Sequence, residues 1–205
     1  MRVLHRLDPI QLRVLGCLIE KQRTTPEQYP LTLNALRLAC NQATNREPVL
    51  DLDESEVRAA AQSLGTLGWA RLATGPGSRT PKYRQLFAEA LDLLPAEVSL
   101  LAVLMLRGPQ TVAELKTRTE RLHHFASTDD VTATLERLDD KELVHLLARQ
   151  AGQREERWAH LLAVGAAEKP SEPDGEPTTI EQRLGRIESR LLELERLLGA
   201  RGLLD

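Results

Sequence analysis

The side chains of this sequence that could do chemistry are few, and they form no catalytic arrangement. His123 and His124 are adjacent and point in different directions on a helix or strand, with no cysteine or carboxylate at a metal-ligand spacing. Cys17 lies within an apolar predicted helix and Cys40 at the end of another, which indicates buried, inert thiols. The Gly-Pro-Gly sequence at residues 75–77 lacks the lysine and hydroxyl residue that complete a phosphate-binding loop. We therefore expect no catalytic residue, no metal and no cofactor, and a protein that is not an enzyme.

The charged residues are distributed unevenly along the sequence. Residues 1–90 hold 12 Lys+Arg and 9 Asp+Glu, whereas residues 91–165 hold 9 and 12, and residues 166–205 hold 6 and 9. The formal net charge of −3 excludes a basic coat over the whole protein but allows a local basic surface. The candidate DNA-binding residues are Arg58, Arg71, Arg79, Lys82 and Arg84. The alternative is a solvated basic hairpin that binds no partner.

The elements that would position these cations follow a repeated order. Each half of the sequence shows three helix starts and then two extended segments around a turn. The predicted starts are Asp8, Thr32 and Asp53 in the first half and Leu94, Thr111 and Ser127 in the second. The extended segments are residues 69–74 and 80–85 in the first half and residues 143–148 and 157–161 in the second. Three helices followed by a β-hairpin is the order of a winged helix, so the pattern predicts two such units in tandem.

The predicted fold is mainly α with small β-hairpins. We expect two tandem winged-helix domains, which we call the first repeat (residues 1–90) and the second repeat (residues 91–165). A flexible acidic and proline-rich linker is expected at residues 166–178, and a coiled-coil helix at residues 179–200. Aromatic residues make up only 3% of the chain, which favours packing of aliphatic helices over a β-sandwich.

The last predicted helix carries a heptad pattern. Its apolar residues, separated by alternating steps of 4 and 3, are Ile180, Leu184, Ile187, Leu191, Leu194 and Leu198. In a parallel oligomer, Arg183 would face Glu188 of a second copy, so we expect a homo-oligomer formed through this helix. The alternative is a helix that docks on its own globular part or frays.

Two features of the first repeat count against base reading by its third helix. The helix opens with the acidic residues Asp53, Glu54 and Glu56, which would face phosphates poorly. The connection at residues 41–52 is also longer than the roughly 3–4 residues of a tight DNA-reading unit. In the second repeat, the hairpin mixes arginines with Glu155 and Glu156, which is typical of mutual surface pairs.

Several polar strings of the sequence resemble those of a known family. They are residues 18–22 and 24–31 between the first two helices, and residues 40–42 and 44–49 before the third. Further matches lie at Arg107-Gly108, Gln110-Thr111 and Glu114-Leu115, and between residues 154 and 161. These strings resemble the YceH-like family of uncharacterised bacterial proteins over residues 7–162. The resemblance implies two winged helices and a bacterial cytosolic setting, implies no established activity, and leaves the linker and heptads outside the match.

The polar strings allow two interpretations. Their prolines and asparagines could fix an unusually long loop onto the first repeat, with Arg46 and Glu47 forming a pair. Alternatively, Gln28, Tyr29, Asn45 and Arg46 present an interaction surface to a protein or a nucleic acid.

The leading functional hypothesis is a non-enzymatic protein of transcription-regulator type that binds double-stranded DNA through the first repeat. The alternative is a protein–protein adaptor that is built on winged helices and binds no DNA. Two cysteines and no export signal predict a cytoplasmic location. No apolar run approaches the ~18 residues of a membrane helix, so no membrane partner is expected.

Overall fold

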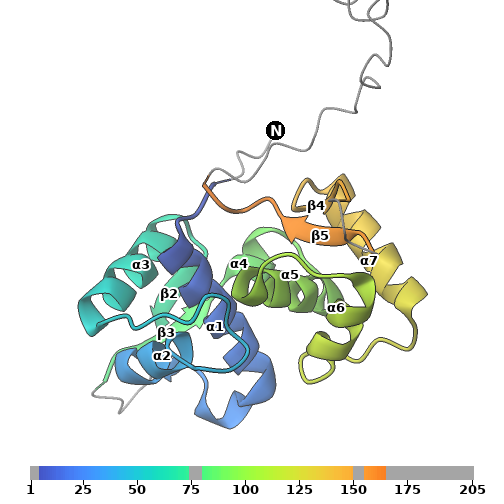
Figure 1. Ribbon diagram of the computed structural model, residues 1–205. Coiled ribbons are helices and arrows are strands. Elements are labelled where there is room, and N and C mark those ends of the chain that lie inside the picture. The colour runs from blue at the N-terminus through green and yellow to red at the C-terminus, as the bar shows by residue number, and fades with distance from the viewer. Residues whose placement is uncertain (1–4, 74–79, 150–154, 165–205) are drawn as a thin grey trace, which may run out of the picture. The chain divides into compact units, whose positions relative to one another are not determined.

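Seven α-helices and two small antiparallel sheets form the part of the chain that the computed structural model describes, residues 5–73, 80–149 and 155–164 (Figure 1). The first repeat contains α1 (Pro9–Thr24), the 3-10 helix η1 (Pro26–Gln28), β1 (Leu31–Thr32), α2 (Leu33–Cys40), α3 (Glu54–Thr66), β2 (Ala70–Ala73), β3 (Lys82–Gln85) and α4 (Phe87–Ala90). The second contains α5 (Pro95–Arg107), α6 (Val112–Thr119), α7 (Thr128–Asp140), β4 (Val144–Leu147) and β5 (Arg157–His160). The prediction of a mainly helical fold with small antiparallel sheets is confirmed.

The helices begin at the capping residues that the sequence predicts. The Asp8 carboxylate accepts from the backbone N–H of Gln11 at 2.8 Å, and the Gln11 side chain accepts from the Asp8 backbone at 3.0 Å. The same reciprocal box closes at Asp53, Thr111 and Ser127. Leu94 has no accepting side chain, and its backbone N–H instead donates to the Glu97 carboxylate at 2.7 Å. Short-range capping chemistry therefore sets where these helices start.

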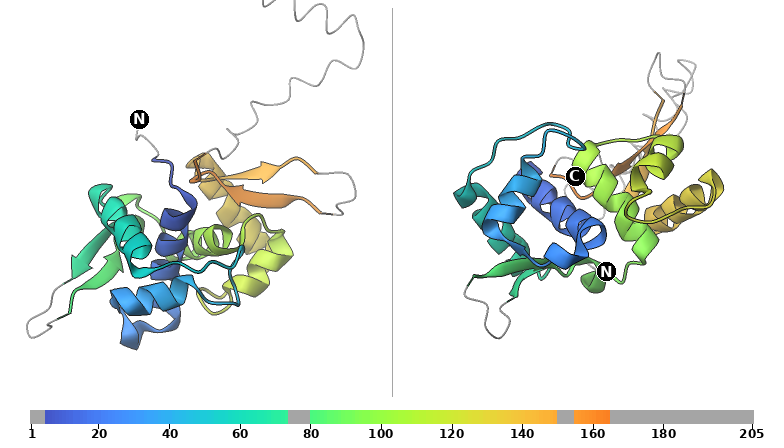
Figure 2. Two further views of the ribbon diagram at one scale, coloured as in Figure 1. Left: turned by 60° about the vertical axis from the view of Figure 1, so that its left-hand side comes forward. Right: turned by 90° about the horizontal axis from the view of Figure 1, so that it is seen from below.

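Each hairpin gains a partner from the segment that precedes the second helix of its repeat. In the first repeat the strand order is β1-β3-β2, with Leu31 opposite Tyr83. In the second repeat β4 pairs with β5, and an isolated bridge joins Gln110 to Trp158 of β5. The sequence predicted the two hairpins but neither of these added contacts. Figure 2 shows the two hairpins on opposite sides of the helices.

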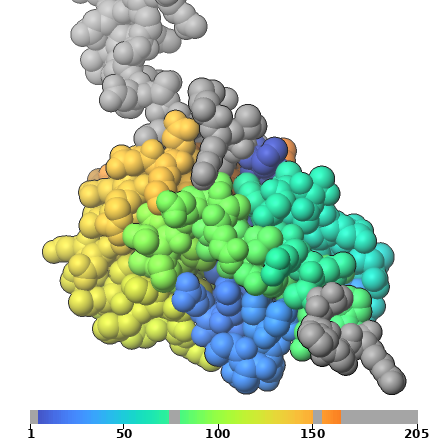
Figure 3. All heavy atoms as spheres, turned by 180° about the vertical axis from the view of Figure 1, so that it is seen from behind, coloured from blue at the N-terminus to red at the C-terminus, as the bar shows by residue number. Residues whose placement is uncertain are grey.

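One hydrophobic core runs through both repeats. Helix α5 is buried on every side from Val98 to Leu106 because it packs against α1 as well as against α6 and α7. Figure 3 shows one continuous surface, in which green residues lie between the teal residues of the first repeat and the yellow residues of the second. The backbones of Leu7 and Ala163 also pair, through Leu7 N–H to Leu162 O at 2.7 Å and Val164 N–H to Leu7 O at 2.8 Å. The two predicted domains, residues 1–90 and 91–165, therefore lie within a single compact unit, residues 1–167.

Gly16 allows α1 and α5 to approach closely. A Cβ atom at this position would lie 2.9 Å from Cγ and Cδ2 of Leu106. Gly16→Val should therefore lower the free energy of unfolding by about 1–3 kcal/mol, because overpacking displaces side chains at the junction of the repeats. Urea denaturation followed by circular dichroism measures the effect.

Gly65 provides the matched control for this substitution. A Cβ atom at Gly65 would lie at an ordinary 3.7 Å from the Ala70 carbonyl, on the exposed side of α3. Gly65→Ala should raise stability by about 0.5–1 kcal/mol through helix propensity. Equal stability of Gly16→Val and the native chain would show that α1 and α5 do not pack at this distance.

Several sequence predictions lie outside the described residues. They concern Arg79, the linker at residues 166–178, and the coiled-coil helix with its six heptad residues. Among the residues that are described, no helix is long and apolar enough to span a membrane.

Candidate nucleic-acid interface

Three of the predicted DNA-binding residues lie on one face of the first sheet. Arg71 of β2 stands directly opposite Arg84 of β3, and Lys82 lies two residues from Arg84 along the same strand. Alternation along β3 buries Tyr83 and turns Lys82 and Arg84 the other way. Opposed residues of an antiparallel pair share a face, so the strand register brings these three cations together. We call Arg71, Lys82 and Arg84 the sheet cations.

One carboxylate offsets part of this positive charge. The Arg84 guanidinium forms an ion pair with Glu89 at 2.7 Å, and Glu89 is exposed. Arg71 and Lys82 make no ion pair with any carboxylate of the described residues. Because exposed pairs contribute little, phosphate can compete with Glu89 for Arg84 at small cost.

Helix α3 presents a narrow polar stripe. Arg58, Gln62 and Thr66 are exposed and spaced by four residues, which places them along one side of the helix. The Ser63 hydroxyl instead accepts a hydrogen bond from the Gln11 amide at 2.8 Å, so it is occupied within the fold. No hydrogen bond or ion pair between described residues joins Arg58 to the sheet cations.

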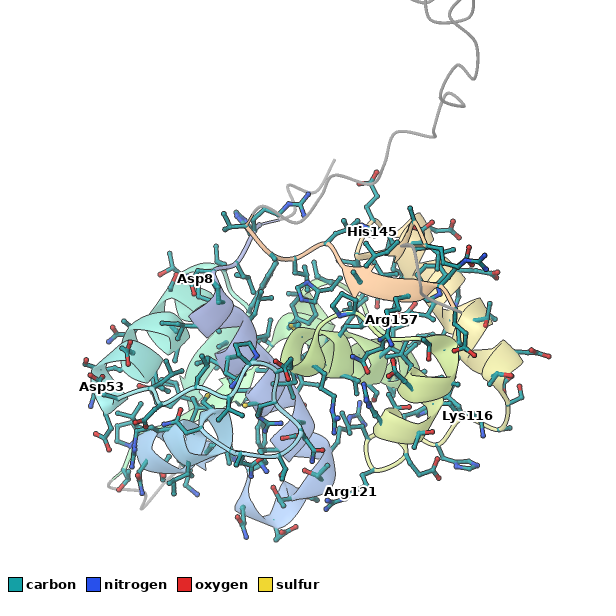
Figure 4. The ribbon with its side chains drawn as sticks, viewed as in Figure 1. Asp8, Asp53, Lys116, Arg121, His145 and Arg157 are labelled. Atoms are coloured by element: carbon teal, nitrogen blue, oxygen red, sulfur yellow. The ribbon has the colours of Figure 1, made fainter. Side chains whose placement is uncertain are left out.

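The acidic start of α3 limits how this helix can meet a polyanion. Asp53 lies at its outer end (Figure 4) and accepts hydrogen bonds from Ser55 and Glu56, which lower the pKa of the Asp53 carboxyl below its ordinary value. The carboxylate therefore stays ionised at neutral pH. The negative charge of this carboxylate disfavours a phosphate group at the first turn of α3.

The corresponding surface of the second repeat is acidic or internally paired. The exposed residues of α7 are Thr128, Asp129, Asp130, Ala133, Glu136, Arg137 and Asp140. Arg157, which occupies the register position of Lys82, donates to Glu114 at 2.8 Å and to the Pro109 carbonyl at 3.0 Å. This hairpin cation is therefore engaged within the fold.

The polar strings of the first repeat divide between the interior and the surface. Arg46 is only 4% exposed, and its guanidinium donates to both carboxylate oxygens of Glu20, at 3.1 and 2.6 Å. It also donates to the Ala39 carbonyl at 3.1 Å and to Gln42 at 2.9 Å. Burial opposes its charge, but the hydrogen bond to Glu20 holds the pKa of Arg46 above its ordinary value. Arg46 thus pairs with Glu20 rather than with Glu47, and it does not face a partner.

The other three members of the expected interaction surface differ in exposure. Tyr29 is half-buried, its hydroxyl accepts from the Gln85 backbone at 2.6 Å, and burial raises its pKa to about 12. Gln28 and Asn45 are exposed, and Asn45 adopts a φ of 62° at the turn before Arg46. Tyr29 therefore joins η1 to β3, and only Gln28 and Asn45 face solvent.

Hydrogen bonds from side chains to the backbone, and one between backbone groups, fix the long connection between α2 and α3. The Asn41 amide donates to the Leu52 carbonyl at 2.8 Å, and its oxygen accepts from the Leu52 N–H at 2.9 Å. Arg13, buried in α1, donates to the Cys40 carbonyl at 2.8 Å and to the Pro48 carbonyl. The Glu47 N–H reaches the Leu106 carbonyl of α5 at 2.8 Å. The loop is therefore held in a fixed conformation and joins α1 of the first repeat to α5 of the second.

The side chains that could bind a metal are dispersed over the described residues. No group of three His, Cys, Asp or Glu side chains within them is placed to hold a metal ion. Cys17 and Cys40 are both buried, and their mutual hydrogen bond together with burial raises the pKa of the Cys40 thiol. The feature of the described residues that bears on function is therefore the shared position of the sheet cations.

The protein is a mainly helical protein with two small antiparallel sheets, and the first sheet carries three cations on one face. The family model described as "Protein of unknown function, DUF480" matches residues 7–153. A UPF0502 protein of Pelobacter propionicus is 48% identical, over 92% of this chain and 90% of its own. Another, from Pectobacterium carotovorum, is 43% identical over 96% of this chain and 98% of its own.

The chain belongs to the DUF480/UPF0502 family of bacterial proteins. This agrees with the resemblance to a YceH-like family. The pairwise matches cover more than nine-tenths of the chain and so extend past residue 165, whereas the resemblance was expected to stop at residue 162.

Proposed function

We propose that the protein is a non-enzymatic, cytoplasmic DNA-binding protein of transcription-regulator type that contacts double-stranded DNA through its first repeat. The single observation that carries this proposal is the shared face of Arg71, Lys82 and Arg84 on the β1-β3-β2 sheet. Cations on one face of a sheet suit the evenly spaced phosphates of a duplex.

The proposal includes a winged-helix fold for each repeat. Its support is the order of three helices and a hairpin, with the segment before the second helix paired to the last strand in both repeats. In such a unit the third helix enters the major groove and the hairpin reaches the adjacent backbone. Arg58, Gln62 and Thr66 would then approach bases while the sheet cations hold phosphates. Self-association through residues 179–200 would add a second DNA-binding surface.

An adaptor role is the second candidate function, and the second repeat favours it. A hollow of about 690 Å³ lies between α6, α7 and the second hairpin, and Leu146 and Trp158 line it beside Glu136 and Glu155. Among the described residues of the lining, Glu136, Glu155 and Glu156 outnumber the one cation, Arg149, so the hollow suits a basic peptide rather than a nucleic acid.

The salt dependence of DNA binding tests the main proposal. Replacing Arg71, Lys82 and Arg84 together with glutamine should weaken binding and reduce the slope of log K against log [salt] by about 2–3, because each lost phosphate contact removes close to 0.9 of slope. Fluorescence anisotropy with a labelled duplex at several salt concentrations measures the slope.

A control with the same change in charge separates the site from the net charge. Lys116, Arg137 and Arg149 belong to the second repeat and not to the first sheet, and their triple glutamine variant should leave the slope unchanged. An equal loss of DNA affinity in the two triple variants would show that DNA is attracted by the net charge of the protein and not by the sheet cations. No binding by the intact protein at low salt would remove the proposal, and capture of one stoichiometric protein partner in the presence of nuclease would then favour the adaptor.

A further inference from the structure

The two repeats enclose a polar hollow of about 540 Å³, distinct from the sheet cations. Its walls come from the end of α1, the connection between α2 and α3, the end of α5, and α6 with the residues that follow it. These segments lie far apart in the sequence, and the contact between α1 and α5 brings them together. The hollow therefore exists only because the repeats form one body.

Four cations and one carboxylate line this hollow. The cations are Lys21, Arg107, Arg118 and Arg121, and the carboxylate is Glu20. Glu20 already accepts two hydrogen bonds from buried Arg46, so the guanidinium charge of Arg46 largely offsets the negative charge of Glu20. Figure 4 shows Arg121 on the side of the second repeat that faces the end of α1. The hollow is thus a concentrated positive surface in a protein of net charge −3.

The cations of the hollow are only partly compensated, and Lys21 lies 3.7 Å from the Glu20 carboxylate that Arg46 also binds. Arg121 makes no ion pair with a carboxylate of the described residues, and Arg107 donates only to the neutral amide oxygen of Asn45. Arg118 lies 3.5 Å from one carboxylate oxygen of Glu114 and shares this carboxylate with Arg157, which binds the other oxygen at 2.8 Å. Burial, and then the positive charges of Arg118 and Arg46, lower the pKa of Arg107. These cations repel one another, and an anion would relieve that repulsion.

Neutral polar residues complete the lining, namely Thr24, Thr25, Gln42, Thr44, Asn45 and Thr117. The hydroxyl groups of Thr24, Thr25 and Thr117 already donate to backbone carbonyls of their own helices, so the guanidinium groups are the main donors that the hollow offers to phosphate oxygens. An apolar ligand has little to contact, since the apolar lining residues are Val103, Leu106 and Leu122.

We propose that the hollow between the repeats binds a small metabolite that carries two or more phosphate charges. The charge follows from the excess of cations in the lining, and the size from a volume suited to a small molecule. A duplex is the competing source of phosphate, but it is convex and rigid, whereas these cations stand on the walls of a recess. The hollow contains none of the sheet cations, so this proposal can be tested separately from DNA binding.

Calorimetry of the full-length protein with inorganic pyrophosphate, at constant ionic strength, tests the proposal. The intact protein should bind one equivalent and gain thermal stability, because a ligand that prefers the folded state stabilises it. The Arg118→Gln/Arg121→Gln variant should lose at least about tenfold in affinity through two missing charge-assisted contacts. A second readout is slower amide exchange in residues 41–53, which would be held by ligand contacts at Thr44 and Asn45.

Matched controls keep each outcome decisive. Lys116→Gln/Arg149→Gln removes the same charge outside the hollow and should bind pyrophosphate as the intact protein does. The thermal midpoint of each variant without ligand establishes that it is folded. No binding by the intact protein, or equal losses in the two variants, overturns the proposal. Loss of duplex binding in the Arg118→Gln/Arg121→Gln variant without any pyrophosphate binding would assign the hollow to DNA instead.

Discussion

Replacing Arg46 with methionine should lower the free energy of unfolding by about 3–5 kcal/mol, the usual cost of breaking a buried ion pair by removing one partner. The Arg46 side chain is fully buried and contacts Glu20, Gln42 and the Ala39 carbonyl. Its removal leaves the Glu20 carboxylate, which is 13% exposed, without the guanidinium that binds both of its oxygens, and of the described cations only the Lys21 ammonium, at 3.7 Å, then offsets its charge. Urea denaturation of the full-length protein at pH 7 measures the loss.

A double variant shows whether the loss comes from the carboxylate that loses Arg46. Glu20→Gln in the Arg46→Met background should restore part of the stability, since it removes the poorly compensated charge. Arg23→Met, an exposed arginine of the same helix α1, should change stability by no more than about 0.5 kcal/mol. A loss below about 1 kcal/mol for Arg46→Met would contradict the role of this residue as an anchor of the long loop.

Acidification should destabilise the fold through His160. Burial, and then the charge of neighbouring His145, lower the pKa of His160 from 6.5 to about 4. The folded state therefore holds His160 neutral, while the unfolded chain takes up a proton below pH 6.5. The stability that this residue contributes is present above pH 6.5 and is lost as pH falls toward 4. The loss amounts to about 3 kcal/mol, since each pKa unit corresponds to ~1.4 kcal/mol.

Comparison of variants isolates the contribution of His160 from that of other groups. His160→Gln keeps an acceptor for the Leu162 N–H, which His160 receives at 3.3 Å, but it cannot titrate. Between pH 7 and pH 4.5 this variant should lose less stability than the intact protein. His124→Gln, at a side chain that is 71% exposed, should follow the intact protein. Parallel losses for all three proteins would show that His160 is not the titrating group.

The helices and hairpins were predictable because local chemistry sets them. Asp8 and Asp53 begin helices by accepting hydrogen bonds from residues three positions ahead, which the sequence displays directly. Strand β1 was not predictable, because two residues carry no periodic pattern and their pairing with β3 depends on residues about fifty positions away. The burial of α5 on all sides likewise follows from contact with α1, which no local pattern records.

The candidate sites were predictable to different degrees. Arg71, Lys82 and Arg84 cluster in the sequence and share a sheet face because strand pairing keeps neighbours together. The cations of the hollow between the repeats were missed, because Lys21, Arg107 and Arg121 belong to separate elements that only tertiary packing assembles. The available signal was the set of family-like strings, since residues 18–22, 24–31, 40–42 and 44–49 and Arg107-Gly108 include most residues of the first repeat that line the hollow, together with Arg107 of α5. Arg46 was ambiguous, since a buried and an exposed arginine look alike in a sequence.

The pairing of Leu7 with Ala163 has a consequence for synthesis on the ribosome. Leu7 hydrogen-bonds to Leu162 and Val164, so its segment cannot reach its final pairing until these residues, more than 150 positions later, have been translated. The first repeat also leaves the apolar face of α1 uncovered until α5 has been translated. A nascent chain that stops before α5 has been translated would expose that apolar face, and we expect chaperones to bind it.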